Sequence, residues 1–71
     1  MEDVIIAFSA RGVALMLSII MVDEPRKRLV EATGTAAADL RRIACGRQAP
    51  TAGVLAYLGL QQRGEEYIWQ A

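Results

Sequence analysis

Six of the eight basic side chains lie between residues 25 and 50. They are Arg26, Lys27, Arg28, Arg41, Arg42 and Arg47. With six basic and two acidic residues, this stretch has a net charge of +4, although the net charge of the whole chain is zero. A guanidinium group can hold a phosphate or donate two hydrogen bonds to one guanine edge. The charge distribution therefore predicts that residues 25–50 face an anionic partner.

The chain offers little else for chemistry. It has one cysteine and no histidine, so an internal disulfide, a zinc ligand set and histidine-based acid–base catalysis lack the residues they need. Six of the eight acids come as adjacent pairs, which we interpret as solvated ends of elements: Glu2-Asp3, Asp23-Glu24 and Glu65-Glu66. We therefore expect no enzyme, no metal and no cofactor. We interpret Cys45 as a small residue at a helix end, and the absence of an internal disulfide favours a cytoplasmic protein.

The basic residues must be positioned by local structure, and the sequence predicts two short helices separated by Gly34. Pro25 suits the first position of the first helix, where Asp23 or Glu24 can cap the free N–H groups. Three residues share the inner face of this helix at helical spacing: Leu29, Val30 and Thr33. Gly34 can adopt the left-handed conformation that ends helices without steric cost.

The second helix is predicted to follow Thr35, which can cap it, and to end at Gly46. Its run AAADLRRIAC contains strong helix formers. The inner stripe consists of Leu40, Ile43 and Ala44. Two short helices joined by a tight turn form the helix-turn-helix arrangement, whose second helix can lie in the major groove of DNA. We place this motif at residues 25–46.

The motif resembles the helix-turn-helix of Cro- and repressor-type phage regulators. The shared features are Val30 four places before the turn glycine, Gly34 itself, and the apolar Leu40 and Ile43 six and nine places after it. The continuation GRQAPTAGVLAYLGL is similar to the loop and helix that follow in many compact prophage regulators. The resemblance covers residues 25–60, about half of the chain, and implies a repressor that binds operator DNA as a dimer.

In this arrangement the recognition helix spans residues 36–45. The residues expected to contact DNA are Arg26, Lys27, Arg28, Thr35, Ala36, Ala37, Ala38, Arg41, Arg42, Arg47 and Gln48. Family members usually open this helix with Ser and Gln, whereas this chain has alanines there. Most polar readout of bases therefore falls to Arg41 and Arg42, and we expect the remaining basic residues to bind phosphates.

Residues 4–22 allow two interpretations. The run contains a single charge, Arg11, and is long enough to be a membrane span followed by a basic cytoplasmic tail. However, a charge near the middle costs about 2.5–3.5 kcal/mol on insertion, and we favour a globular role. In that role, residues 3–8 form a strand or part of a helix, and Ser9 caps a helix that runs to about Val22. A helix this apolar needs covering on more than one face, which suggests a second subunit.

The C-terminal part is predicted to complete the core. Thr51 can cap a helix that includes Val54, Leu55 and Leu58 and that closes at Gly59. Residues 61–64 look like a polar turn, and residues 65–70 look like a short strand that pairs with residues 3–8 or with a second subunit. Its residues Tyr67, Ile68 and Trp69 are candidates for a dimer interface, with core packing as the alternative.

The sequence as a whole predicts a mainly α-helical domain of about four helices over residues 1–71, with a short terminal β-strand pairing. We expect a sequence-specific DNA-binding regulator, a Cro-like phage or prophage repressor, whose partners are double-stranded DNA and a second copy of the chain. Two other functions remain open: a single-span membrane protein, and a helix-turn-helix scaffold that binds protein instead of DNA.

Overall fold

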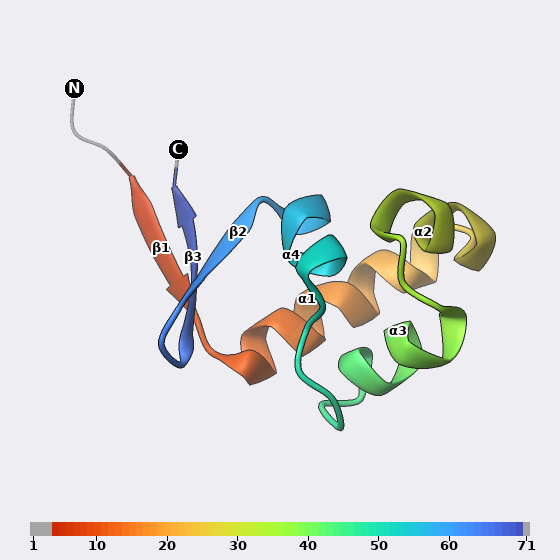
Figure 1. Ribbon diagram of the computed structural model, residues 1–71, viewed down its shortest axis with the longest axis horizontal. Coiled ribbons are helices and arrows are strands. Elements are labelled where there is room, and N and C mark those ends of the chain that lie inside the picture. The colour runs from red at the N-terminus through yellow and green to blue at the C-terminus, as the bar shows by residue number, and fades with distance from the viewer. Residues whose placement is uncertain (1–3, 71) are drawn as a thin grey trace.

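The computed structural model describes residues 4–70. Along the chain, the elements are β1 (Ile5–Phe8), α1 (Ala10–Asp23), α2 (Arg26–Thr33), α3 (Ala37–Ala44), α4 (Ala52–Leu58), β2 (Leu60–Arg63) and β3 (Glu66–Gln70). The helices pack together at one end of the molecule, and the strands form a small sheet at the other (Figure 1). The prediction of a mainly helical domain with terminal strand pairing is confirmed.

The sheet is antiparallel, with β3 between β1 and β2. The C-terminal strand therefore pairs with the N-terminal strand of the same chain, as one of the two predicted pairings required. In the register, Tyr67 lies opposite Phe8 on β1 and opposite Gln62 on β2. The prediction of a polar turn at residues 61–64 is wrong, because these residues belong largely to β2. The turn itself is formed by residues 64–65, where Gly64 has a φ of +63°.

The apolar N-terminal run is divided at Ser9. Its hydroxyl accepts a hydrogen bond from the Gly12 amide at 3.2 Å and caps α1, as predicted. The strand interpretation of the preceding residues is thus confirmed and the continuous helix is wrong, although Asp3 lies outside the described residues. Within residues 4–70, no helix combines the length and apolar character that a membrane crossing needs.

The two helices of the motif are each eight residues long and are separated by three residues. Gly34 ends α2 in the left-handed conformation, with a φ of +63°, as predicted. The start of α2 differs from the prediction. Pro25 is the N-cap residue rather than the first helical residue, and no side chain caps this end. Asp23 and Glu24 cannot serve as that cap because they form the C-terminal end of α1.

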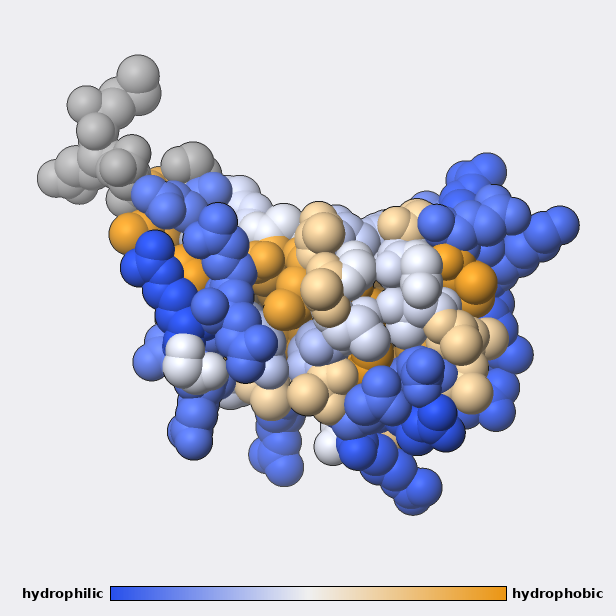
Figure 2. Space-filling model, viewed as in Figure 1, coloured by the Kyte–Doolittle hydropathy of each residue, from blue (hydrophilic) through white to orange (hydrophobic). Residues whose placement is uncertain are grey.

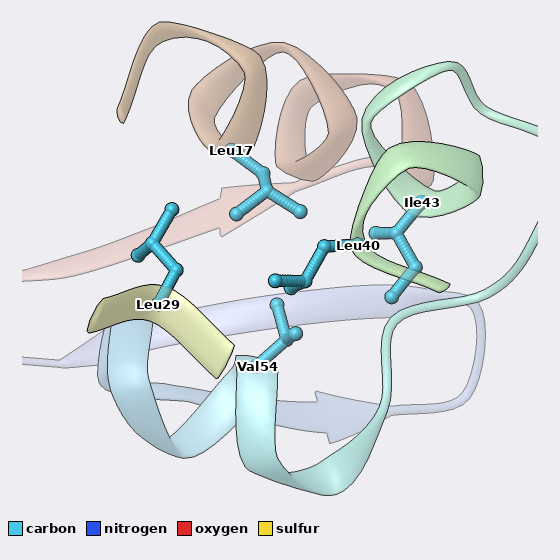
Figure 3. Packing of buried hydrophobic residues seen from close by; sticks show 5 residues of the cluster. All are labelled: Leu17, Leu29, Leu40, Ile43 and Val54. Carbon is cyan, nitrogen blue, oxygen red and sulfur yellow. The ribbon is translucent and has the colours of Figure 1, made fainter. Parts of the chain in front are cut away.

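The helices enclose a helical core, which we define as Leu17, Leu29, Leu40, Ile43 and Val54. Each of the four helices contributes to it, and the side chains point toward one another (Figure 3). The predicted inner faces of α2 and α3 are confirmed, because Leu29, Leu40 and Ile43 are almost completely buried. α1 fills its expected role through Leu17, which closes the core against the motif.

A second cluster joins the helices to the sheet and consists of Val13, Leu55, Leu60 and Tyr67. α4 contacts both clusters, because Val54 faces the helical core and Leu55 faces the sheet. Its predicted cap is confirmed: the Thr51 hydroxyl accepts a hydrogen bond from the Val54 amide at 3.2 Å. Gly59 ends α4 with a φ of +74°, as predicted.

Candidate nucleic-acid interface

The two sides of α3 differ sharply in character. Leu40 and Ile43 fix one side in the core. The residues that lie away from them, Ala38, Arg41 and Arg42, are exposed. α3 therefore presents a face with one methyl group and two guanidinium groups, which is the face that would enter a DNA groove in a helix-turn-helix protein.

The guanidinium of Arg42 is held in place by two neighbours. Its Nη2 atom lies 2.5 Å from Asp39 Oδ1, one turn earlier on α3, and its Nε atom donates to Gln48 Oε1 at 3.1 Å. A guanidinium has five N–H groups, so these contacts leave three of them free. A half-exposed guanidinium with a fixed orientation is prepared to donate a pair of hydrogen bonds to one planar acceptor edge.

Arg41 is exposed, and within residues 4–70 it forms no ion pair or side-chain hydrogen bond. Arg26, Lys27 and Arg28 are exposed at the start of α2. Of these three, only Arg28 has an acidic partner among residues 4–70, with its Nη1 atom 3.7 Å from Glu24 Oε2. Hydrophilic side chains project over α2 and α3 at the helical end of the molecule (Figure 2). A less polar surface over α4 separates them from the hydrophilic β2–β3 hairpin.

Thr35 does not occupy the surface position that the sequence predicts. It is buried, its hydroxyl lies 2.7 Å from that of Thr51, and the same hydroxyl donates to the Thr33 carbonyl at 3.3 Å. The prediction that Thr35 caps the second helix is also wrong, because the N-cap residue is Ala36. Thr35 therefore stabilises the turn, and its side chain is not available to a base.

The other predicted DNA contacts are accessible to different degrees. Ala36 and Ala38 are exposed and Ala37 is half-buried, so methyl groups line the beginning of α3. After α3, Arg47 is exposed, while Gln48 is half-buried against Arg42. The structure thus brings Arg41, Arg42, Arg47 and the alanines to the surface around α3.

The predicted dimer residues on β3 fall into different environments. Tyr67 is buried in the cluster between helices and sheet, so the alternative of core packing holds for this residue. The indole of Trp69 lies beside Gly59 of the same chain and is 36% exposed. Ile68, on the opposite side of the strand, is half-buried.

Sequence reasoning missed Asp39, which positions Arg42. An acid three residues before an arginine on one helix is a recognisable signal, because residues at this spacing are neighbours on the helix surface. Cys45 is exposed at the C-terminal end of α3.

No family model, curated protein or solved structure matches this chain.

Proposed function

We propose that this protein is a sequence-specific DNA-binding transcriptional regulator of the Cro-like phage or prophage repressor type. It acts in the cytoplasm of a bacterial or phage-infected cell and binds operator DNA with α3 as the recognition helix. The observation that carries the proposal is the exposed face of α3, where Arg42 is oriented by Asp39 and Gln48 beside the exposed Arg41. The short link with its left-handed Gly34 gives the two helices the connection typical of helix-turn-helix proteins.

The basic residues divide into two roles. Arg42 is assigned to base readout, because its remaining N–H groups suit the O6 and N7 acceptors of guanine. Arg41, Arg26, Lys27 and Arg47 are assigned to phosphates, since they are exposed and make no side-chain hydrogen bond or ion pair within residues 4–70. Asp39 lowers the local charge at Arg42, so that base recognition depends on geometry more than on general attraction to phosphate.

The alanines at the start of α3 have a complementary role in the proposal. Ala36, Ala37 and Ala38 carry no polar group that could read a base. Their small size permits a close approach of the helix to the groove floor, and their methyl groups can contact the methyl group of thymine. The preferred site therefore contains a guanine for Arg42 and tolerates or favours thymine near the N-terminus of α3.

The protein is further proposed to act as a homodimer that reads two half-sites about one helical turn apart. A single helix of eight residues offers few base contacts, so a second copy is needed for operator affinity. The half-sites of a two-fold dimer are arranged as an inverted repeat, which gives the operator a recognisable symmetry.

Selection of bound duplexes from a random DNA pool tests the proposal. The expected result is an enriched inverted repeat, which the purified chain binds at least about 1,000-fold more tightly than a scrambled duplex in physiological salt. Binding should weaken steeply as salt increases, because phosphate contacts release counterions. No enrichment, together with equal and weak binding to all duplexes, would contradict DNA recognition and favour a scaffold that binds protein.

A further inference from the structure

α1 carries an apolar stripe on the side that faces away from the molecule. Leu15, Ile19 and Val22 recur at i, i+4 and i+7 and are 61%, 59% and 83% exposed. The opposite side of α1 supplies Leu17 to the helical core, across from Val54 of α4 (Figure 3). More than half of each side chain in the stripe is therefore left uncovered by this chain, although all three are large and aliphatic.

The charges at the two ends of the stripe are placed unfavourably for an isolated helix. Arg11 lies in the first turn of α1 and Asp23 is its last residue, and both are exposed. The helix dipole favours acids at the N-terminal end and bases at the C-terminal end, so each charge opposes it. Among residues 4–70, neither side chain has an ion-pair partner.

An antiparallel second copy of α1 would reverse both relationships. If the two-fold axis passes at the level of residue 17, Leu15 of one copy lies opposite Ile19 of the other. In the same register Arg11 lies opposite the other copy's Asp23, and the symmetry creates this pair twice. Each arginine then also meets the negative end of the other helix, and each aspartate meets the positive end. One register thus pairs Leu15 with Ile19 twice and brings the opposite charges to the same level at both ends, while Val22 lies at the level of the other copy's Gly12.

We infer that α1 is the homodimer interface, formed by antiparallel packing of α1 on α1 of a second copy, with Leu15 against the other copy's Ile19 and Val22 at the level of its Gly12. The Arg11–Asp23 pairs at its ends set the direction and register of the two helices. A shallow groove of about 590 Å³ borders Leu15 between α1 and residues 44–49 and leaves room for side chains of the second copy. The inference builds on the proposed homodimer but not on DNA binding, because dimerisation is measured without DNA.

Sedimentation equilibrium of the full chain and its variants tests the position of the interface. The wild-type chain should form dimers at micromolar concentration, and Ile19→Lys should raise the dimer Kd at least about tenfold. The matched control is Ile5→Lys on the edge strand β1, where the isoleucine is 61% exposed, and this variant should dimerise like the wild type. Circular dichroism should give the same helix content for all three proteins.

Charge exchange tests the direction of the two helices. At low salt, Arg11→Asp and Asp23→Arg should each weaken the dimer by about tenfold, because each places like charges together at both ends. An equal mixture of these two variants should restore dimerisation as a heterodimer, and the double variant should restore a homodimer. Arg11 and Asp23 are about 18 Å apart along one helix, so a direct contact within one chain cannot explain the rescue. Each single variant should remain at least as stable when monomeric, since its new charge suits the helix dipole.

Three outcomes would overturn the inference. The first is a wild-type chain that stays monomeric at several hundred micromolar. The second is loss of the dimer in Ile5→Lys but not in Ile19→Lys, which would show that the interface lies at the edge strand β1 and not on α1. The third is a mixture of Arg11→Asp and Asp23→Arg that dimerises no better than either variant alone.

Discussion

The hydroxyl oxygens of Thr35 and Thr51 lie 2.7 Å apart and join the turn of the helix-turn-helix to the start of α4. Thr51 also caps α4 by accepting a hydrogen bond from the Val54 amide. Thr35 is tied to the end of α2 through the hydroxyl and carbonyl of Thr33. These bonds connect the end of α2, the link to α3 and the beginning of α4, so the orientation of α3 depends on α4.

Replacement of Thr51 by valine should therefore destabilise the protein by about 1–2 kcal/mol. Valine keeps the shape of threonine but removes both the helix cap and the partner of the Thr35 hydroxyl. The control is Thr51→Ser, which retains the hydroxyl and should recover most of the loss. Urea unfolding measures the difference, and equal midpoints for Thr51→Val and wild type would contradict the role of this contact.

Gly53→Ala should destabilise the protein by at least about 2 kcal/mol. α4 approaches α2 so closely that a Cβ on Gly53 would overlap the backbone carbonyl of Thr33, and the backbone must shift to relieve the overlap. Gly12→Ala is the matched control within a helix. Its added Cβ would meet Phe8 at an ordinary distance of 3.6 Å, so the change should be neutral or should stabilise by up to about 1 kcal/mol. Equal midpoints for the two variants in thermal unfolding would show that α4 can move without cost.

Local signals explain why much of the fold was predictable from sequence. Ser9 and Thr51 cap the helices that follow them, and Gly34 and Gly59 end helices in the left-handed conformation. Each of these features depends on a few neighbouring residues. The helical spacing of Leu40 and Ile43 likewise identified the buried side of α3 before its packing partners were known.

The features that were missed depend on contacts between distant segments. β2 has the polar sequence LQQR and looks like a turn, but pairing with β3 makes it a strand. The two-residue turn at Gly64 was the available signal for this hairpin. Thr35 looked like a surface cap because its bond to Thr51 spans sixteen positions in the sequence. For the same reason, the environment of Tyr67 could not be decided before the register of the sheet was known.

Arg26→Ala should weaken binding to all duplexes alike. Arg26 is exposed at the start of α2, where we assign it to a phosphate, so its loss should lower the slope of log K against log salt by about one unit. Arg63→Ala removes an equal charge from the hairpin at the other end of the molecule and should change the slope little. Fluorescence anisotropy over a salt series measures both slopes. Identical slopes of log K against log salt for the two variants would show that Arg26 does not contact a phosphate.

Arg42→Ala should affect preferred and scrambled duplexes differently. Loss of a base-reading guanidinium should cost about 1–3 kcal/mol on the preferred duplex and relax the preference at one base pair. Asp39→Ala should give a distinct result: binding to scrambled DNA should strengthen because a negative charge is lost, while discrimination should fall because Arg42 loses its orientation. If both variants keep the wild-type ratio of preferred to scrambled affinity, Arg42 does not read a base.

Glutamate at Ala38 gives the most direct test of α3 as the DNA-binding surface. Ala38 lies on the exposed side of α3, and glutamate is a good helix former, so Ala38→Glu should fold normally. A carboxylate between the helix and DNA should cost about 2 kcal/mol or more in binding free energy. Ala56→Glu makes the same change at an exposed alanine on α4 and is the matched control. The measurement is the affinity of both variants and the wild type for the selected duplex: we expect binding to be lost only in Ala38→Glu, and wild-type affinity in Ala38→Glu would contradict DNA recognition by α3.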